Sequence, residues 1–182
     1  MGGKLQHEVL KSREKNSICS QKKTFLGFRK PIRVVNLFER FMAKELPEWR
    51  FVSLAEAEVE QLPGKTHHWL CKPGMVKDTN LMFVRAQLPP GEAHKFHFHP
   101  KMEEILYILS GTAMQWVEHE KKTMRAGDSL YLPAGIIHGT YNIGSDMLDF
   151  LAILSPAKSE GPVTVEVADQ EPWKSLRCNP PA

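Results

Sequence analysis

The sequence predicts an all-β fold, built as a single antiparallel sandwich or barrel. After Gly64, short apolar segments alternate with clusters of turn residues, without the strand–helix alternation that is typical of a parallel sheet. A chain of 182 residues with 42% hydrophobic and 25% charged residues can bury one ordinary core. The expected strands are rich in β-branched, aromatic and aliphatic residues. They are Leu81–Leu88, Ile105–Leu109, Thr112–Val117, Ser129–Leu132 and Met147–Leu154.

The chain begins with a basic segment. Residues 1–30 show no apolar periodicity and predict a flexible arm. Residues 1–45 hold eleven Lys and Arg against four Glu, whereas the remainder holds thirteen against seventeen acidic residues. A basic arm can contact nucleic acid, but this one lacks interleaved aromatic residues and nucleic-acid motifs, so we expect no nucleic-acid partner. A transit peptide, or a natural start at Met42, are open alternatives.

Residues 31–63 predict helices that dock on the barrel. Apolar residues between Val34 and Leu46 recur at helical spacing until a proline ends the pattern. The stretch Ser53–Glu56 has the spacing of a capping box. It therefore predicts a second, short helix that Pro63 closes.

Residues 64–155 should form the barrel, and residues 156–182 a Pro-rich tail with one strand at Val163–Val167. No apolar run approaches the roughly 20 residues needed to span a bilayer, and residues 1–30 lack the apolar stretch of a secretory signal. We therefore expect a cytoplasmic protein that does not insert into a membrane. The three cysteines are widely separated, which predicts ordinary thiols rather than disulfides or a zinc knuckle.

Four of the eight histidines lie in or beside two turn-flanked segments. His97 and His99 are two residues apart on an expected strand, so both imidazoles face one side with Cα atoms roughly 6.5 Å apart. Both rings can then approach a metal ion at about 2.1 Å from each nitrogen. Glu104 begins the next strand and can supply a third ligand, and the turn at 133–135 can direct His138 inward. These four side chains are candidate metal ligands.

Three other histidines are weaker candidates. His94 has the opposite strand parity to His97, so it should face away from the metal. His67 and His68 are adjacent, so only one of them can face the interior, and we expect a surface position for either.

The sequence leaves open whether four further residues line the pocket. Arg85 and Gln87 alternate with apolar neighbours, so they either line the pocket, where Arg85 would bind an anionic substrate, or lie on the outer face. The same two positions are possible for Asp149, which in the pocket is a possible general base. Tyr131 either packs in the core or lines the pocket. The sequence assigns no catalytic residue.

The two histidine-containing segments also carry two spaced motifs. The first is Gly, five residues, His-x-His, four residues, Glu, six residues and Gly, and it runs from Gly91 to Gly111. The second is Gly, five residues, Pro-x-Gly, two residues, His, three residues and Asn, and it runs from Gly127 to Asn142. Both motifs are met in full, and in them residues 64–155 resemble the cupin family.

The resemblance implies a single antiparallel jelly-roll β-barrel, here with short N-terminal helices. It also implies that one divalent metal ion lies inside the barrel, held by the four candidate ligands. Glu103 is the rival carboxylate, and the count of six residues to Gly111 favours Glu104. Asn142 is interpreted as a structural hydrogen-bonding residue and not as a ligand.

Three imidazoles and one carboxylate suit Fe(II), Mn(II), Ni(II), Co(II) or Zn(II). An octahedral ion would keep two positions for water, substrate or oxygen. We therefore expect a metal-dependent enzyme, either a dioxygenase or an isomerase, epimerase or lyase, that acts on a small organic acid or polyol. The alternative is a non-catalytic module that binds or senses a small ligand through the same metal. The exposed strand edges of one small barrel predict a homodimer, with the contact made by the helix near 34–46 or by the tail strand.

Overall fold

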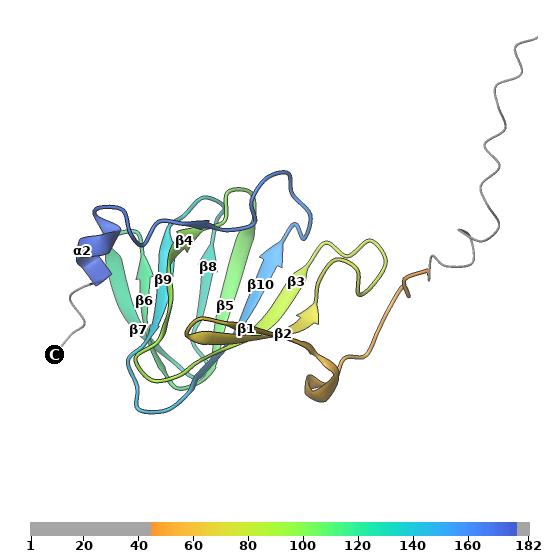
Figure 1. Cartoon of the computed structure of the whole chain (residues 1–182), viewed down its shortest axis with the longest axis horizontal. Helices are drawn as coiled ribbons and strands as arrows, with labels where there is room; N and C mark the ends of the chain where they lie inside the picture. Colours follow the sequence, from red (N-terminus) through yellow and green to blue (C-terminus); the bar gives the residue numbers. More distant parts are fainter. Residues whose placement is uncertain (1–44, 178–182) are drawn as a thin grey trace, which may run out of the picture. The chain divides into compact units, whose positions relative to one another are not determined.

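The computed structural model describes residues 45–177. Within this range the chain forms two antiparallel sheets, of six and five strands (Figure 1). The strands are β1 (Glu58–Leu62), β2 (Lys65–Cys71), β3 (Met82–Leu88), β4 (Ala93–Phe98), β5 (Glu103–Ser110), β6 (Thr112–Val117), β7 (Glu120–Arg125), β8 (Ser129–Leu132), β9 (His138–Asn142), β10 (Leu148–Ser155) and β11 (Val165–Glu166). Two short helices complete the segment, the 3-10 helix η1 (Leu54–Glu56) and α2 (Trp173–Arg177). The six-stranded sheet has the order β1-β2-β3-β10-β5-β8, and the five-stranded sheet has the order β11-β4-β9-β6-β7.

This architecture confirms the predicted all-β jelly roll. The five expected strands correspond to β3, β5, β6, β8 and β10, and the bounds of β6 and β8 are those predicted. The tail strand is also present as β11, but it is shorter than expected and pairs with β4. Turn residues placed the strand ends well because glycine and proline interrupt the ladder wherever they occur.

The short helix predicted from Ser53 is present as η1, but it ends well before Pro63, and residues 58–62 form a strand. The capping box does form, since the backbone N–H of Ser53 donates to Glu56 Oε2 at 3.3 Å, but η1 ends after three residues because Ala57 is extended. Residues 58–62 then pair with β2 as a strand, and the turn at 63–64 joins this hairpin instead of closing a helix. Cross-strand pairing outweighs the local helical signal. The expected arm over 1–30 and the helix near 34–46 lie outside the described residues, apart from Glu45 and Leu46.

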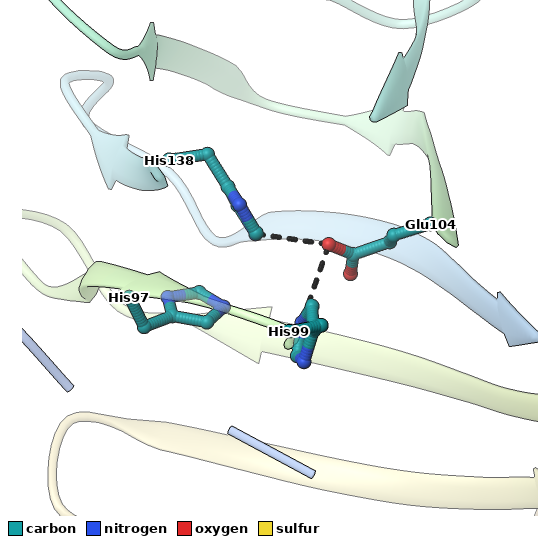
Figure 2. A group of neighbouring side chains, drawn as sticks. All are labelled: His97, His99, Glu104 and His138. Atoms are coloured by element: carbon teal, nitrogen blue, oxygen red, sulfur yellow. Dashed lines mark ion pairs between the residues drawn. The ribbon is translucent and has the colours of Figure 1, made fainter. Parts of the chain in front are cut away.

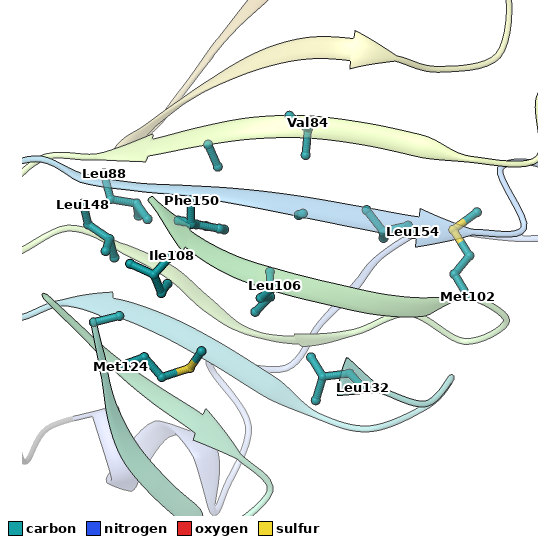
Figure 3. Packing of buried hydrophobic residues seen from close by; sticks show 13 residues of the cluster. Val84, Leu88, Met102, Leu106, Ile108, Met124, Leu132, Leu148, Phe150 and Leu154 are labelled. Carbon is teal, nitrogen blue, oxygen red and sulfur yellow. The ribbon is translucent and has the colours of Figure 1, made fainter. Parts of the chain in front are cut away.

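The main apolar core fills the space between the two sheets (Figure 3). Leu88, Ile108 and Leu148 are fully buried there, together with Phe150 at 1% exposure. These residues alternate along β3, β5 and β10 with side chains that point to the opposite face of the six-stranded sheet. Asn142, at the end of β9, closes one end of this core, because its Nδ2 donates to the carbonyls of Leu88 and Asp146 and its Oδ1 accepts from Gly144 N. The structural role that the sequence predicts for Asn142 fits these bonds.

A second apolar cluster covers the outer face of the five-stranded sheet. Phe96 and Trp116 pack there against Trp173 of α2 and against Val167, which follows β11. Because Phe96 points outward, its neighbour His97 points inward, toward the space between the sheets. The tail therefore helps to set which face of β4 is directed into the barrel.

Candidate metal centre

The structure brings the four predicted ligands together between the two sheets (Figure 2). His97 on β4 pairs directly with His138 on β9, and His99 follows the end of β4. Glu104 reaches them from β5 of the opposite sheet. One ligand atom from each side chain lies within 4.8 Å of all the others, and all four side chains are buried. The rival Glu103 is exposed and accepts a hydrogen bond from Tyr131 Oη at 2.9 Å.

The backbone orients each of the three imidazoles through its Nδ1. Nδ1 of His97 lies 2.6 Å from the carbonyl of Lys95, and Nδ1 of His138 lies 3.0 Å from that of Ile136. Nδ1 of His99 lies 2.8 Å from the Val163 carbonyl in the tail. A carbonyl can only accept, so Nδ1 carries the proton in each ring and Nε2 of a neutral ring presents its lone pair to the centre. This is how proteins orient a metal-ligating histidine.

The inward-facing atoms of the four side chains lie close together, but most of them do not form hydrogen bonds with one another. Glu104 Oε2 lies 2.9 Å from His138 Nε2 and 3.5 Å from His99 Nε2. Nevertheless, Glu104 Oε2 and the Nε2 atoms of His97 and His99 find no hydrogen bond of acceptable geometry among the described residues, although all three atoms are buried. Buried polar atoms without partners are costly, and a cation at their common focus removes that cost. The donor set therefore fits a divalent transition metal.

The electrostatics of His97 and Glu104 favour the forms of these two groups that bind a metal. Burial lowers the pKa of His97 to about 3, with a further contribution from His138. Burial alone would raise the pKa of Glu104, but the contacts with His138 and His99 outweigh it and hold this pKa well below its usual range. Burial lowers the pKa of His99, whereas the contact with Glu104 outweighs burial and raises it above the ordinary value. His97 is thus neutral and Glu104 ionised at physiological pH.

The expectation that His94 faces away from the metal is wrong. Its ring stacks on that of His97 with centroids 4.1 Å apart, and it lies 5.9 Å from the ring of His67. The β4–β9 pairing shifts register between His94 and His97, which marks a bulge. A bulge adds one residue to one strand, so residues of opposite parity then share a face. His94 is not among the clustered ligand atoms, and this part of the expectation agrees with the geometry.

A cavity of about 740 Å³ adjoins the cluster, and His99, Glu104, His94 and His67 are among its lining residues. His67 was expected at the surface, but it is 9% exposed and faces this cavity. The parity prediction for the pair holds, since His68 points the other way and contacts Gln87 Oε1 at 3.2 Å. Strand parity indicates that only one of the two adjacent histidines can face inward, but β2 has polar and apolar residues on both faces, so its sequence does not show which one.

Arg85, Gln87, Asp149 and Tyr131, the candidate pocket residues, do not line this cavity. Asp149 is paired with Arg85, whose Nε donates to Oδ1 at 2.8 Å, and with Gln87 Nε2 at 3.2 Å. These residues alternate with the inward-facing side chains of β3 and β10, so they lie on the outer face of the six-stranded sheet. An ion-paired Asp149 on that face is not placed to act as a general base in the cavity.

The buried His67 should make stability depend on pH. Burial, with a contribution from Lys65, lowers its pKa from 6.5 to about 4, so between these values the unfolded chain binds a proton that the folded protein does not. Stability from this group is therefore present above pH 6.5 and is lost as the pH falls toward 4. Between pH 7 and pH 5, urea titration should show the wild type losing about 2 kcal/mol more unfolding free energy than His67→Gln. Equal slopes for wild type and His67→Gln would refute the assignment.

Comparison with known proteins agrees with this geometry. The family described as Cupin domain matches residues 84–154, which contain all four clustered side chains. The chain is 34% identical over 87 residues to the oxalate-binding protein of Thermotoga maritima, covering 48% of this chain and 71% of the relative. It is 30% identical over 120 residues to the polyketide synthase CurC of Streptomyces cyaneus, covering 64% of this chain and 78% of the relative. A crystal structure of a predicted oxalate decarboxylase from Thermotoga maritima matches with a TM-score of 0.54 at 26% identity, covering 59% of this chain and 99% of that one.

Proposed function

The chain belongs to the cupin superfamily, and from this premise we propose that it is a metal-dependent enzyme acting on a small molecule. Its one divalent ion would be held by His97, His99, Glu104 and His138. The observation that carries the proposal is the anchoring of all three Nδ1 atoms on backbone carbonyls, which aims three Nε2 lone pairs at one carboxylate. A purely structural polar cluster would not need three imidazoles that are all anchored through Nδ1.

The donor set suits Fe, Mn, Ni, Co or Zn. When bound, such an ion supplies Lewis acidity for isomerase, epimerase or lyase chemistry, or a site for dioxygenase chemistry. The protein's own contribution is to keep the four donors buried, to neutralise one positive charge with Glu104, and to leave a cavity beside His99 and Glu104 for a substrate. A pair of substrate oxygens, as in an organic acid or polyol, would fit the positions that the four protein ligands leave open.

A non-catalytic binding or sensing module is the second candidate. It is favoured by the similarity to a protein named for oxalate binding. The two functions differ in turnover: a binding module gains stability from its ligand, whereas an enzyme also converts it.

The test begins with the metal content of protein purified without chelators or a nickel column. Stoichiometric transition metal in the wild type, with loss of metal in His138→Ala, is the expected result. Protein loaded anaerobically with Fe(II) is then screened for oxygen uptake, and the Mn, Ni, Co and Zn forms for isomerisation or cleavage of organic acids. Full metal occupancy in His138→Ala would contradict the assigned ligand set, and ligand-induced stabilisation without turnover in any metal form would favour the binding module.

We also propose a homodimer formed through the outer face of the six-stranded sheet. In the single chain this face exposes Ile105, Tyr107 and Leu109 of β5 and Tyr131 of β8, which form an apolar patch on neighbouring strands. The tail strand, expected to make the contact, instead pairs with β4 of its own chain. Exposed apolar patches of this kind commonly mark an interface.

Light scattering at micromolar concentration should return twice the mass of one chain for the wild type. Ile105→Lys should weaken the dimer at least about tenfold, because a lysine in a desolvated apolar interface costs more than 1.4 kcal/mol. Ile143→Lys, an exposed isoleucine after β9, is the control. A monomeric wild type would refute the proposal.

The cytoplasmic location and the division of the chain at residues 30, 63 and 155 stay predictions. No helix within residues 45–177 is long and apolar enough to span a membrane.

A further inference from the structure

The cavity beside the metal cluster is large for the small acids and polyols that a metal centre alone would suggest. Its volume of about 740 Å³ lies in the range of roughly 300–1,000 Å³ typical of pockets that enclose drug-sized ligands. An oxygen pair bound next to His99 and Glu104 would occupy one part of it. The rest of the cavity has room for a much larger frame.

The walls of the cavity are mainly apolar. Trp69 of β2, Met82 and Val84 of β3, and Phe150 and Leu154 of β10 contribute to them. They come from the face of the six-stranded sheet that also builds the main core, so this wall of the cavity continues the apolar core. The hollow exists where small side chains replace large ones, at Ala86 and Ala152, which are 2% and 5% exposed. A polyol would lose its hydrogen bonds to water against such walls without regaining them.

The buried polar side chains of the cavity lie together at the metal cluster, whereas most of the other polar residues that line it are exposed: Glu60, Lys95, Glu166, Asp169 and Gln170. His94 and His67 extend from the metal cluster as a row of rings, with His94 stacked on His97 and 5.9 Å from His67. His67 Nδ1 is buried, finds no hydrogen-bond partner among the described residues, and lies 3.8 Å from Glu60 Oε2. An unpartnered buried nitrogen in the wall of a cavity is suited to bind a polar atom of a ligand.

The charge at the cluster selects for acidic oxygens. A divalent ion held by three neutral imidazoles and one carboxylate keeps a net positive charge inside a buried site, where an anionic donor is preferred. The ligand should therefore be acidic at one end and apolar over most of its surface.

We infer that the cavity binds an organic acid or enol with a large, mainly apolar, aromatic frame, whose oxygen pair lies at the metal cluster and whose frame lies against Trp69 and Phe150. The apolar part of this inference depends on the cavity alone, while the placement of the oxygen pair rests on the proposed function. Within the expected class of organic acids, it favours bulky aromatic members over oxalate-sized ones and over polyols.

The test is calorimetric titration of metal-free and metal-loaded protein with 1-hydroxy-2-naphthoate, oxalate and xylitol. The metal-loaded protein should bind the naphthoate at least about tenfold more tightly than oxalate, and xylitol should not bind. In the metal-free protein naphthoate binding should weaken but persist, because the apolar walls remain, whereas oxalate binding should disappear.

Two variants test the site itself. Ala152→Phe fills the hollow and should weaken naphthoate binding at least tenfold at unchanged metal content, while Ile153→Phe, the next residue on the outer face of β10, should not. Trp69→Ala removes one wall without overfilling the core, and it should also weaken naphthoate binding if Ala152→Phe proves unfolded by circular dichroism.

The outcomes separate the two proposals. Tight metal binding with naphthoate no stronger than oxalate, or naphthoate binding that neither Ala152→Phe nor Trp69→Ala reduces, would overturn the inference and leave the proposed function intact. Naphthoate binding that Ala152→Phe abolishes in a protein that takes up no metal would support the cavity assignment and overturn the proposed function.

Discussion

Replacing Glu104 by glutamine should lower the affinity for a divalent transition metal by at least about 100-fold, whereas replacing Glu103 should leave it unchanged. Loss of a residue that merely orients a metal ligand typically costs 10–100-fold, and Glu104 is the only anion in the described cluster. Without its charge, a divalent ion would be buried among three neutral rings with no compensation. Glu103 is adjacent in sequence but exposed, so it is a matched control of the same charge.

The measurement is competition titration with a chelating dye, followed by elemental analysis of each variant. Circular dichroism and urea titration of the metal-free proteins check that Glu104→Gln is folded, since the change also removes the contact with His138. If Glu104→Gln retained the affinity of the wild type, the carboxylate would not be a ligand. If Glu103→Gln lost metal instead, the motif count to Gly111 would point to the wrong residue.

Replacing Gly111 by alanine should lower the free energy of unfolding by about 3 kcal/mol, and replacing Gly127 should lower it by only about 1 kcal/mol. Both motif glycines adopt left-handed backbone, with φ of +87° and +92°, so alanine is strained at either position. Only at Gly111 would the new Cβ also meet backbone, at 2.8 Å from Leu148 Cα and 2.8 Å from the Met147 carbonyl oxygen. At Gly127 no atom lies within 4 Å of it.

Urea titration of both variants measures the difference, with the wild type as reference. Gly111 joins β5 to β6, and Leu148 begins β10, so the clash would push apart two strands of the core. Equal losses at the two glycines would show that the turn relaxes and that backbone strain alone sets the cost. A larger loss at Gly127 would contradict the packing argument.

Much of the fold was readable from the sequence because turn chemistry is local. Glycine and proline clusters end strands wherever they occur, so the bounds of β6 and β8 agree with those predicted. The cluster of His97, His99, Glu104 and His138 was readable for a related reason. Two residues that are two positions apart on a strand point to the same face, which groups His97 with His99. The number of residues between Glu104 and Gly111 in the motif selects the carboxylate. Neither argument needs to know which strands pair.

Other features depend on pairing between distant segments. Residues 58–62 form a strand because β2 is available to pair with them, although the preceding capping box signals a helix. The pocket candidates Arg85 and Asp149 alternate with apolar residues along β3 and β10. The apolar residues face the core, and Arg85 and Asp149 form an ion pair on the opposite face of the sheet. Strand periodicity shows that such residues lie on one face, but not which of the two faces is the interior.

The four candidate metal ligands were identified from the sequence itself, because they stand at fixed spacings within two motifs of the chain. The tertiary structure alone decided that His94 and His67 accompany the cluster and that a cavity of about 740 Å³ lies beside it. His94 joins His97 because the pairing of β4 with β9 contains a bulge, and a bulge reverses the parity on which the sequence prediction relied. The cavity arises from small residues that different strands bring side by side, and no spacing along one strand records that.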